Sequence, residues 1–430
     1  MTTLDPVSTR QHAHGLDEND PLRQFRKRFY VPPGTTYLDG NSLGLLSREA
    51  ERSVFDALES WKTQGIDGWL AADPPWFTLG EQLGAKMAPL IGAAPESVVV
   101  TGSTTVNLHQ AIGSFYRPAG RRRKILATGL DFPSDVYAMQ SQIRLRGGDP
   151  ERDLILVPSR DGRTISEDDL IAAMTDEVAL TMLPSVLYRS GQLLDIPRLT
   201  TAAHEVGIAI GFDCAHSVGA VPHRFDEWGI DFAVWCTYKH LNSGPGGIGA
   251  LYVNPSHFGT VPALAGWWGF RRDRQFEMAH EWDGAEHAGA FQIGTIPLLS
   301  SAALLGSLAI FEEAGIEAIR AKSLAQTDFL IALIEGLGLC NAPYNYRIGT
   351  PRNHAQRGGH VAIEHDEAIA ISLALKQKRF IVDFRKPDVV RLAPIALYTT
   401  FHEVWKVAHA LREIIDTGAY RQVEASGLVT

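Results

Sequence analysis

The sequence predicts an α/β protein whose larger domain is an α/β/α sandwich around a mostly parallel, seven-stranded sheet. Short apolar runs rich in valine and isoleucine alternate with helical patterns, which is typical of parallel strands joined by crossover helices. The length of 430 residues favours two lobes over one. The expected strands are SVVVT (97–101), KILAT (124–128), DLILV (153–157), VALTMLP (178–184), IAIGFD (208–213), FAVWC (232–236) and IGALYV (248–253).

A change of pattern near residue 296 predicts the start of a smaller C-terminal α+β domain. Long helices are expected over 296–313 and 316–337, and Ser47 is a suitable N-cap for a helix through Trp61. We divide the chain into an N-terminal arm and helix packing on the small domain (1–60), a large domain (61–300) and a small domain (301–430). The last helix should bury a stripe made of Phe401, Val404, Trp405, Ala408, Leu411 and Ile415.

Composition and charge argue against several functional classes. A net charge of -9 gives little reason to expect a nucleic-acid partner, and no window reaches the roughly 18 consecutive apolar residues of a membrane span. The charged first thirty residues do not resemble a signal peptide. The three cysteines lack CxxC spacing, so neither a disulfide framework nor a metal site is expected. These features fit a cytoplasmic protein.

Histidines outside the strand ends have ordinary explanations. His12 and His14 belong to a polar segment that reads as a flexible arm, because nothing near it has metal-ligand spacing. The remaining scattered histidines are expected mostly at the surface; they are His354, His360, His365 and His402.

Polar residues follow three of the predicted strands, at the sheet edge where ligands collect in parallel α/β folds. The glycine and hydroxyl residues 102–105 open a helix and could hold a phosphate, although a capped helix start would look the same. Asp213 taken alone would be a cap, and Lys239 taken alone a surface residue. Together they match the needs of pyridoxal 5'-phosphate, which takes a Schiff-base lysine, a carboxylate at its pyridinium nitrogen, and amides and hydroxyls at its phosphate.

Longer motifs extend this interpretation to nearly the whole chain. They are YLDGNSLG (37–44), TVNLH (105–109), FPSD (132–135), the segment 211–247 that contains WCTYKHLN, GWWG (266–269) and RLAPIALY (391–398). In these motifs the sequence resembles the kynureninases, a family of class V, fold type I pyridoxal-phosphate enzymes. The pair FPSD and WCTYKHLN separates that family from cysteine desulfurases and other class V relatives.

The resemblance implies a set of cofactor contacts. Lys239 would bind the cofactor's aldehyde, Asp213 would pair with its ring nitrogen, and Phe132 would stack on the ring. Asp135 and His216 would support the ring from the side. The phosphate contacts would be Thr104, Thr105 and Tyr238, joined by Trp268 and Thr295 from the second subunit of a homodimer.

The resemblance also implies substrate contacts and one departure from the family pattern. Arg391 would hold the substrate's α-carboxylate, a task suited to a bidentate donor, with Ser42 and Trp69 as further contacts. Pro184, followed by Ser185, stands where many members have a serine or threonine that faces the cofactor's ring hydroxyl. That hydroxyl contact is therefore not expected from Pro184.

The implied reaction is hydrolysis of L-kynurenine to anthranilate and L-alanine, within the kynurenine pathway of tryptophan catabolism. The same cleavage would turn 3-hydroxykynurenine into 3-hydroxyanthranilate, and Trp69 with Thr295 resembles the bacterial type, which favours kynurenine. The freed Lys239 amine would take the α-proton, Asp213 would keep the ring charged, and Tyr238 is the candidate acid.

Three alternatives remain open at this stage. A cysteine desulfurase would need a reactive thiol on a mobile loop, and Cys340 lacks the serine and glycine neighbours of such loops. An aminotransferase would release a keto acid from the same cofactor. A non-catalytic pyridoxal-phosphate sensor would carry a DNA-binding region or an altered lysine, and neither is evident.

Overall fold

The predicted seven-stranded sheet is present in the computed structural model, which describes residues 9–423. The strand order is β2-β8-β7-β6-β5-β3-β4, and β8 alone runs antiparallel to its neighbours. The strands are β2 (Val98–Val100), β3 (Lys124–Thr128), β4 (Leu154–Val157), β5 (Val178–Pro184), β6 (Ala209–Asp213), β7 (Phe232–Cys236) and β8 (Gly249–Val253). Each predicted strand and the mostly parallel sheet are confirmed.

Helices cover both faces of this sheet and complete the sandwich. Alternate strand residues point to opposite faces, so that Val98 and Val100 enter one core while Val99 enters the other. The core containing Val99 is covered by α5 (Thr104–Phe115) and α6 (Pro133–Leu145). The other core is covered by α4 (Leu79–Met87), α8 (Glu167–Ala173), α9 (Ile196–Glu205) and the short α10 (Phe225–Trp228), while α7 (Pro150–Asp153) leads into β4.

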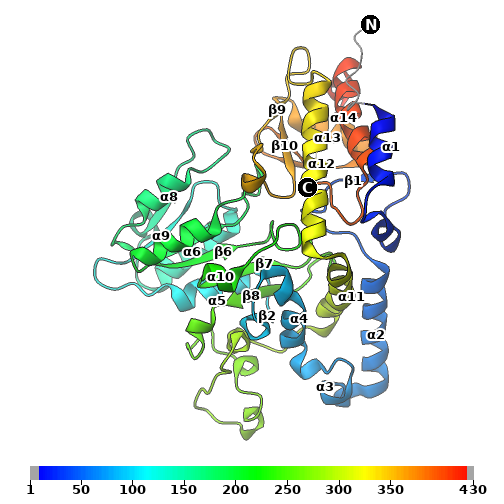
Figure 1. Ribbon diagram of the computed structural model, residues 1–430. Coiled ribbons are helices and arrows are strands. Elements are labelled where there is room, and N and C mark those ends of the chain that lie inside the picture. Colours follow the sequence, from blue (N-terminus) through cyan, green and yellow to red (C-terminus); the bar gives the residue numbers. More distant parts are fainter. Residues whose placement is uncertain (1–8, 424–430) are drawn as a thin grey trace.

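The C-terminal part forms a separate α+β lobe, which confirms the smaller domain of the prediction. Its antiparallel sheet has the order β12-β13-β10-β9, with β12 (Asp383–Arg385), β13 (Val389–Leu392), β10 (Val361–Glu364) and β9 (Arg347–Ile348). Its helices are α12 (Ile316–Gly336), α13 (Ala368–Gln377) and α14 (Phe401–Asp416). In Figure 1 the yellow α12 runs through this small lobe beside α14.

The expected apolar stripe of α14 lies mainly in the small-lobe core. Phe401, Val404, Ala408 and Leu411 are buried, whereas Trp405 and Ile415 are partly buried at the edge of that core. The helix begins at a capping box in which Thr400 and Glu403 satisfy each other's backbone amides.

The expected flexible arm at the N-terminus is instead a helix, α1 (Arg10–Glu18), packed against α14. The Asp17 carboxylate accepts hydrogen bonds from the backbone N–H groups of Phe401 (2.7 Å) and His402 (3.0 Å). These are amides at the start of α14, which have no partner within their own helix. The prediction was wrong because Ala13 is the one residue of α1 that is fully buried, so the sequence carries no clear apolar face.

The rest of the N-terminal segment connects both lobes. The parallel pair β1 (Thr36–Tyr37) and β11 (Phe380–Ile381) joins it to the small lobe. Ser47 caps α2 (Arg48–Gln64), as predicted, with its Oγ 3.1 Å from the N–H of Ala50. Helix α2 then packs along α11 (Leu298–Ala314), and α3 (Gly68–Ala71) follows it. The domain boundaries after residues 60 and 300 stay a prediction.

Helices α11 and α12 match the two long helices expected in this region, with ends shifted by a few residues. Among residues 9–423, no helix is both long enough and apolar enough to cross a membrane.

The contact between α2 and α11 depends on one glycine. A Cβ at Gly306 would overlap the backbone of Glu49 and Ala50. We expect Gly306→Ala to lower the free energy of unfolding by about 1–3 kcal/mol, because two packed helices would have to separate. The control is Gly336→Ala, since a Cβ at this helical glycine would meet nothing within 4 Å. Denaturant unfolding of both variants measures the effect, and equal stabilities would contradict this account.

Candidate functional site

Asp213 and Lys239 lie close together because β6 and β7 are parallel neighbours whose carboxyl ends reach the same sheet edge. Asp213 is the last residue of β6, and its Oδ1 accepts a hydrogen bond from the backbone N–H of Ala215 at 2.8 Å. Lys239 lies just beyond β7, with its Nζ 2.9 Å from Nε2 of His216. The structure therefore brings together three residues that the sequence predicted for one site.

Three aspartates gather at this edge without a matching number of cations. Burial raises the pKa of Asp131 to about 7. Burial, and then the charge of Asp213, raises the pKa of Asp135 well above its usual value. Burial also raises the pKa of Asp213, although the Lys239 cation opposes that rise. A cationic ring nitrogen placed here would stabilise the ionised form of Asp213, and a protonated Asp135 could donate a hydrogen bond to it.

The start of α5 has a cap and, within the described part of the chain, two hydroxyls without a partner. Ser103 caps the helix by accepting from the N–H of Val106 at 3.4 Å. The hydroxyls of Thr104 and Thr105 make no hydrogen bond within residues 9–423, and their side chains are partly or fully exposed. The cap is thus confirmed, while anion binding stays a prediction for which the hydroxyls of the next two residues remain free at the helix N-terminus.

Phe132 presents an apolar surface at the same edge. It precedes α6, its side chain is 42% exposed, and its ring meets that of Tyr188 edge-on at 5.2 Å between centroids. A large exposed aromatic ring beside buried carboxylates is suited to stack on a planar ligand.

The hydroxyl groups of Tyr238 and Ser185 lie in different surroundings. Burial, followed by the Cys236 thiol, raises the pKa of Tyr238 above its usual value, so this hydroxyl keeps its proton. Pro184 pairs in register with Asp213, and the Ser185 hydroxyl donates to the main-chain oxygen of Asp213 at 3.0 Å. Ser185 therefore uses its hydroxyl within the protein.

Arg391 is buried on β13 with several partners. Its guanidinium pairs with Asp383, donates to the main-chain oxygen of Tyr188 at 2.6 Å, and lies 3.1 Å from Oγ of Ser42. Burial lowers the pKa of Arg391 to about 10, so it remains a cation at neutral pH. The structure thus groups Arg391 with Ser42, as predicted, and adds Asp383 and Tyr188, which the sequence interpretation missed.

The N-terminal motif reaches the lysine turn through a glycine. The N–H of Gly44 donates to the main-chain oxygen of Tyr238 at 2.8 Å, and a Cβ at Gly44 would overlap Asn242 and the Lys239 backbone. Only glycine fits at this approach. The contact places the segment that carries Ser42 against the turn that carries Lys239.

Several histidines near the site are buried, contrary to the expectation that they lie at the surface. His360 is fully buried, with its ring 6.1 Å from that of His216, and His365 is also buried, whereas His354 is exposed and His402 is half-buried. Burial lowers the pKa of both His216 and His360 well below the usual value. The prediction failed because His360 is covered by Gly191 of the large lobe and His365 packs on the Tyr346 ring within the small lobe, and neither contact is visible as a sequence pattern.

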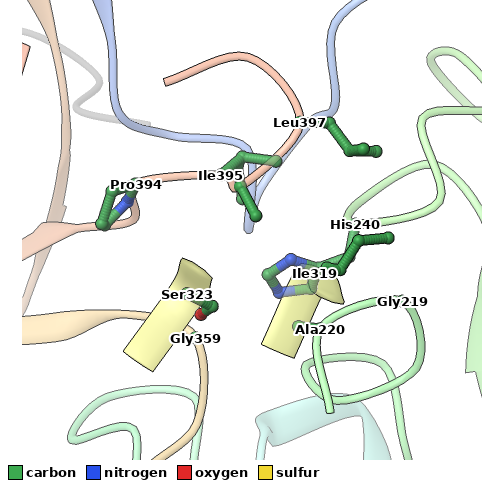
Figure 2. A pocket seen from close by; sticks show the side chains of 10 residues that line it. Gly219, Ala220, His240, Ile319, Ser323, Gly359, Pro394, Ile395 and Leu397 are labelled. Carbon is green, nitrogen blue, oxygen red and sulfur yellow. The ribbon is translucent and has the colours of Figure 1, made fainter. Parts of the chain in front are cut away.

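His240, the residue after Lys239, lies where the two lobes meet (Figure 2). Its ring faces a cavity that Ala220 lines from the large lobe and that Ser323 and Gly359 line from the small lobe. The cavity measures about 10 Å³, which is room for one water molecule. The lobes are therefore in close contact beside Lys239.

The remaining predicted residues lie in a different cavity. Trp69, Trp268 and Thr295 line an apolar cavity of about 660 Å³ that shares no lining residue with the Lys239 group. The Trp268 ring lies 5.5 Å from those of Trp69 and Phe77. Its buried Nε1 has no hydrogen-bond partner within the described chain. The structure thus brings these three residues together but not with Lys239.

The first group of residues fits pyridoxal phosphate. A lysine amine beside an imidazole, a half-buried carboxylate, an exposed aromatic ring and an unused helix N-terminus match the four parts of that molecule. No cluster of residues within 9–423 could hold a metal ion. Asp383 was detectable in principle, because it is a charged residue inside the apolar run FIVDF.

The buried pair of Arg391 and Asp383 leads to a stability prediction. We expect Asp383→Ala to lower the free energy of unfolding by about 3–5 kcal/mol, because Arg391 would stay buried without its carboxylate. Asp169→Ala is the control, since Asp169 pairs with the exposed Arg160 and should change stability little. Denaturant unfolding compares the two, and an equally mild loss from Asp383→Ala would refute a structural role for the buried pair.

Comparisons with known proteins point to one family. Residues 319–411 match the family model "Kynureninase C-terminal domain". The chain is 54% identical to a kynureninase of Geobacillus thermodenitrificans over 98% of this chain and 97% of that protein. It is 56% identical to a kynureninase of Bacillus anthracis, over 97% and 96% of the two chains.

Solved structures support the fold alone. The apo cysteine desulfurase of Thermococcus onnurineus NA1 superposes with a TM-score of 0.77 at 18% identity, covering 92% of this chain and 98% of that one. A C-DES variant with glycine covalently linked to its PLP cofactor gives a TM-score of 0.76 at 19% identity, covering 90% and 98%. The sequence identities over nearly the full length, together with the matching C-terminal domain, establish that the chain belongs to the kynureninase family.

Proposed function

We propose that this protein is a pyridoxal-phosphate-dependent hydrolase that cleaves the Cβ–Cγ bond of L-kynurenine to give anthranilate and L-alanine. The observation that carries the proposal is the convergence of Asp213 and Lys239 at adjacent strand ends, in a chain of this family. The cofactor, once bound, withdraws electrons from the substrate's α-carbon, and the protein's own residues do the rest.

The residues named above would hold the cofactor at both ends. Asp213 would pair with the ring nitrogen, while Phe132 would stack on the ring. The free hydroxyls of Thr104 and Thr105, together with the N-terminal amides of α5, would bind the phosphate. Lys239 would hold the aldehyde through Nζ until the substrate amine replaces it.

Arg391 would bind the α-carboxylate of the substrate. The partners that hold its guanidinium are Asp383, Ser42 and the Tyr188 carbonyl, so this cation is fixed in place before the substrate arrives. Such prior positioning lowers the entropy cost of binding and orients the α-carbon.

Two residues would move protons. Nζ of Lys239, once released, takes the α-proton. Its neighbour His216 is neutral and only weakly basic because burial lowers the pKa of that imidazole, so it competes little for the α-proton. Tyr238, whose pKa is raised, would supply a proton to the carbon that becomes the alanine methyl group. A water molecule supplies the oxygen of the anthranilate carboxylate.

We propose further that the enzyme is a homodimer with shared active sites. Trp268 has a buried, unpartnered Nε1, and Thr295 is exposed beside it. Large apolar side chains are exposed around this cavity, including Ile66 (78%), Leu70 (73%) and Phe276 (67%). An apolar surface of this kind favours a partner subunit, whose cofactor Trp268 and Thr295 would reach. Trp69 would then contact the aromatic ring of the substrate.

The desulfurase alternative is not supported by the thiols. Partial burial raises the pKa of Cys340, whereas a reactive cysteine needs a lowered pKa. Burial raises the pKa of Cys214 and Cys236 as well.

The first test measures anthranilate fluorescence after the purified protein is mixed with L-kynurenine, with 3-hydroxykynurenine as a competitor. Lys239→Ala should lose both activity and the visible absorbance of the bound cofactor. Arg391→Ala should keep the absorbance and raise KM by at least about tenfold, since it removes a charged contact to the substrate. A native protein that shows the absorbance but releases no anthranilate would overturn the substrate assignment and leave a sensor or an aminotransferase.

The second test asks whether two subunits share each site. Lys239→Ala and Trp268→Ala are each expected to be inactive, and mixing them with subunit exchange should restore about a quarter of the native activity. Half of the dimers would then be hybrids, and each hybrid would have one site with both native residues. No recovery, in spite of proven subunit exchange, would contradict a shared site.

A further inference from the structure

His223 is a buried histidine that lies outside the residues proposed to bind cofactor or substrate. It lies in the segment between β6 and α10, is 4% exposed, and packs against the rings of Phe225 (4.8 Å between centroids) and Trp228 (5.8 Å). Its Nε2 is 2.9 Å from Oγ of Ser217. Buried polar side chains are normally hydrogen-bonded, and His223 makes this bond at Nε2 while its Nδ1 has no partner within residues 9–423.

The hydrogen bond from His223 is the first of a chain that ends at Asp213. Oγ of Ser217 lies 2.7 Å from Oγ of Ser185, and Oγ of Ser185 lies 3.0 Å from the main-chain oxygen of Asp213. Ser185 and Ser217 are both fully buried. No water is needed to connect His223 to the residue proposed to bind the cofactor's ring nitrogen.

The last acceptor sets the direction of the bonds along this chain. A main-chain oxygen only accepts, so the bond from Ser185 to Asp213 uses the Ser185 hydroxyl hydrogen. While that bond is made, the bond between the two serines runs from Ser217 to Ser185, and the bond between His223 and Ser217 uses the Nε2–H of the imidazole when Ser217 accepts it. Burial lowers the pKa of His223 to about 3, so its imidazole stays neutral and carries a single ring N–H.

This direction also excludes proton delivery along the chain. A proton that entered at His223 would arrive at a carbonyl oxygen, which cannot pass it to the cofactor or to the substrate. The chain can only hold its members in place.

Asp213 is held by hydrogen bonds to both its main-chain oxygen and its carboxylate. Its oxygen accepts from both the hydroxyl and the backbone N–H of Ser185, the latter at 2.8 Å. Its carboxylate accepts from the N–H of Ala215, in the turn that leads to Ser217. The Ser217 hydroxyl also lies 3.3 Å from the main-chain oxygen of Cys214, a competing acceptor to which it could turn. Donation from His223 polarises the Ser217 hydroxyl and strengthens its bond to Ser185.

We propose that His223 is a positioning residue that orients the Asp213 carboxylate toward the cofactor's ring nitrogen through Ser217 and Ser185. This inference rests on the proposed function, because it assumes that Asp213 binds that nitrogen. It assigns His223 a role that acts through hydrogen bonding and not through charge.

The test uses the holoenzyme and three variants of similar size. His223→Leu keeps the volume and removes the donor, His223→Gln keeps a donor at a similar distance, and Phe225→Leu disturbs the packing around His223 but leaves the chain intact. The two measurements are the steady-state kinetics with L-kynurenine and the pH midpoint of the cofactor's visible absorbance, with thermal stability recorded alongside.

We expect His223→Leu to lower kcat about tenfold with KM changed by less than about twofold, because a small displacement of Asp213 affects the reacting step more than binding. The absorbance midpoint should shift by about half a pH unit or more, since it reports protonation of the nitrogen that joins Lys239 to the cofactor, whose pKa depends on the charge at the ring nitrogen. His223→Gln should keep kcat and the absorbance midpoint close to those of the wild-type protein, and Phe225→Leu should change only the thermal stability.

The proposal is overturned if His223→Leu leaves the absorbance midpoint unchanged, if His223→Gln is as impaired as His223→Leu, or if Phe225→Leu reproduces the shift. A double-mutant cycle combines His223→Leu with Ser217→Ala. The kcat of the double variant should be no lower than that of either single variant, because both changes break the same hydrogen-bond chain. Additive losses would also refute the chain. If the wild-type protein had no kynurenine activity but His223→Leu still shifted the absorbance midpoint, the result would count against the proposed substrate and in favour of the role of His223.

Discussion

The half-buried position of Asp213 at the end of β6 is the constraint on which the site depends. A carboxylate in this position is unfavourable unless a cation and hydrogen-bond donors surround it. The sheet order supplies them, because Lys239 follows the adjacent strand β7 and Ser185 follows the other neighbour, β5. Residues far apart in the sequence become the partners of one acid, and the same edge gathers Asp131 and Asp135, whose pKa values are raised by burial. A ring cation would relieve this excess of acids.

The second buried charge, Arg391, explains why both lobes and the N-terminal segment are needed. Arg391 comes from the small lobe, Tyr188 from the large lobe, and Ser42 from the segment before α2. Gly44 joins that segment to the lysine turn through the oxygen of Tyr238. The tight contact at His240 closes the lobes beside Lys239. A substrate held by Arg391 would therefore lie between lobes whose relative position is fixed by main-chain contacts, close to the amine of Lys239.

The sequence predicted those parts of the fold in which local pattern and burial agree. The seven strands were recognisable because central parallel strands are apolar on both faces, as in FAVWC, whose five residues are all buried. The helix α1 was missed because Ala13 is its one fully buried residue and its contact with α14 through Asp17 joins segments far apart in the sequence. Asp213 and Lys239 were found because strand ends have a known geometry. His360 and His223 were not found, because their burial depends on tertiary packing that leaves no periodic signal, whereas Asp383 left a signal that was overlooked, a charged residue inside the apolar run FIVDF.

The buried imidazoles give the site its charge balance. Burial lowers the pKa values of His216, His223, His240 and His360, in each case with help from nearby cations. Neutral histidines can donate or accept hydrogen bonds without adding positive charge. A charged imidazole beside Arg391 would offer the substrate carboxylate a second binding position, and one beside Asp213 would compete with the ring nitrogen. Since these four are neutral, Lys239 and Arg391 remain the cations available to ligands among the site residues discussed above. The amine acts on the α-carbon, and the guanidinium binds the carboxylate attached to it.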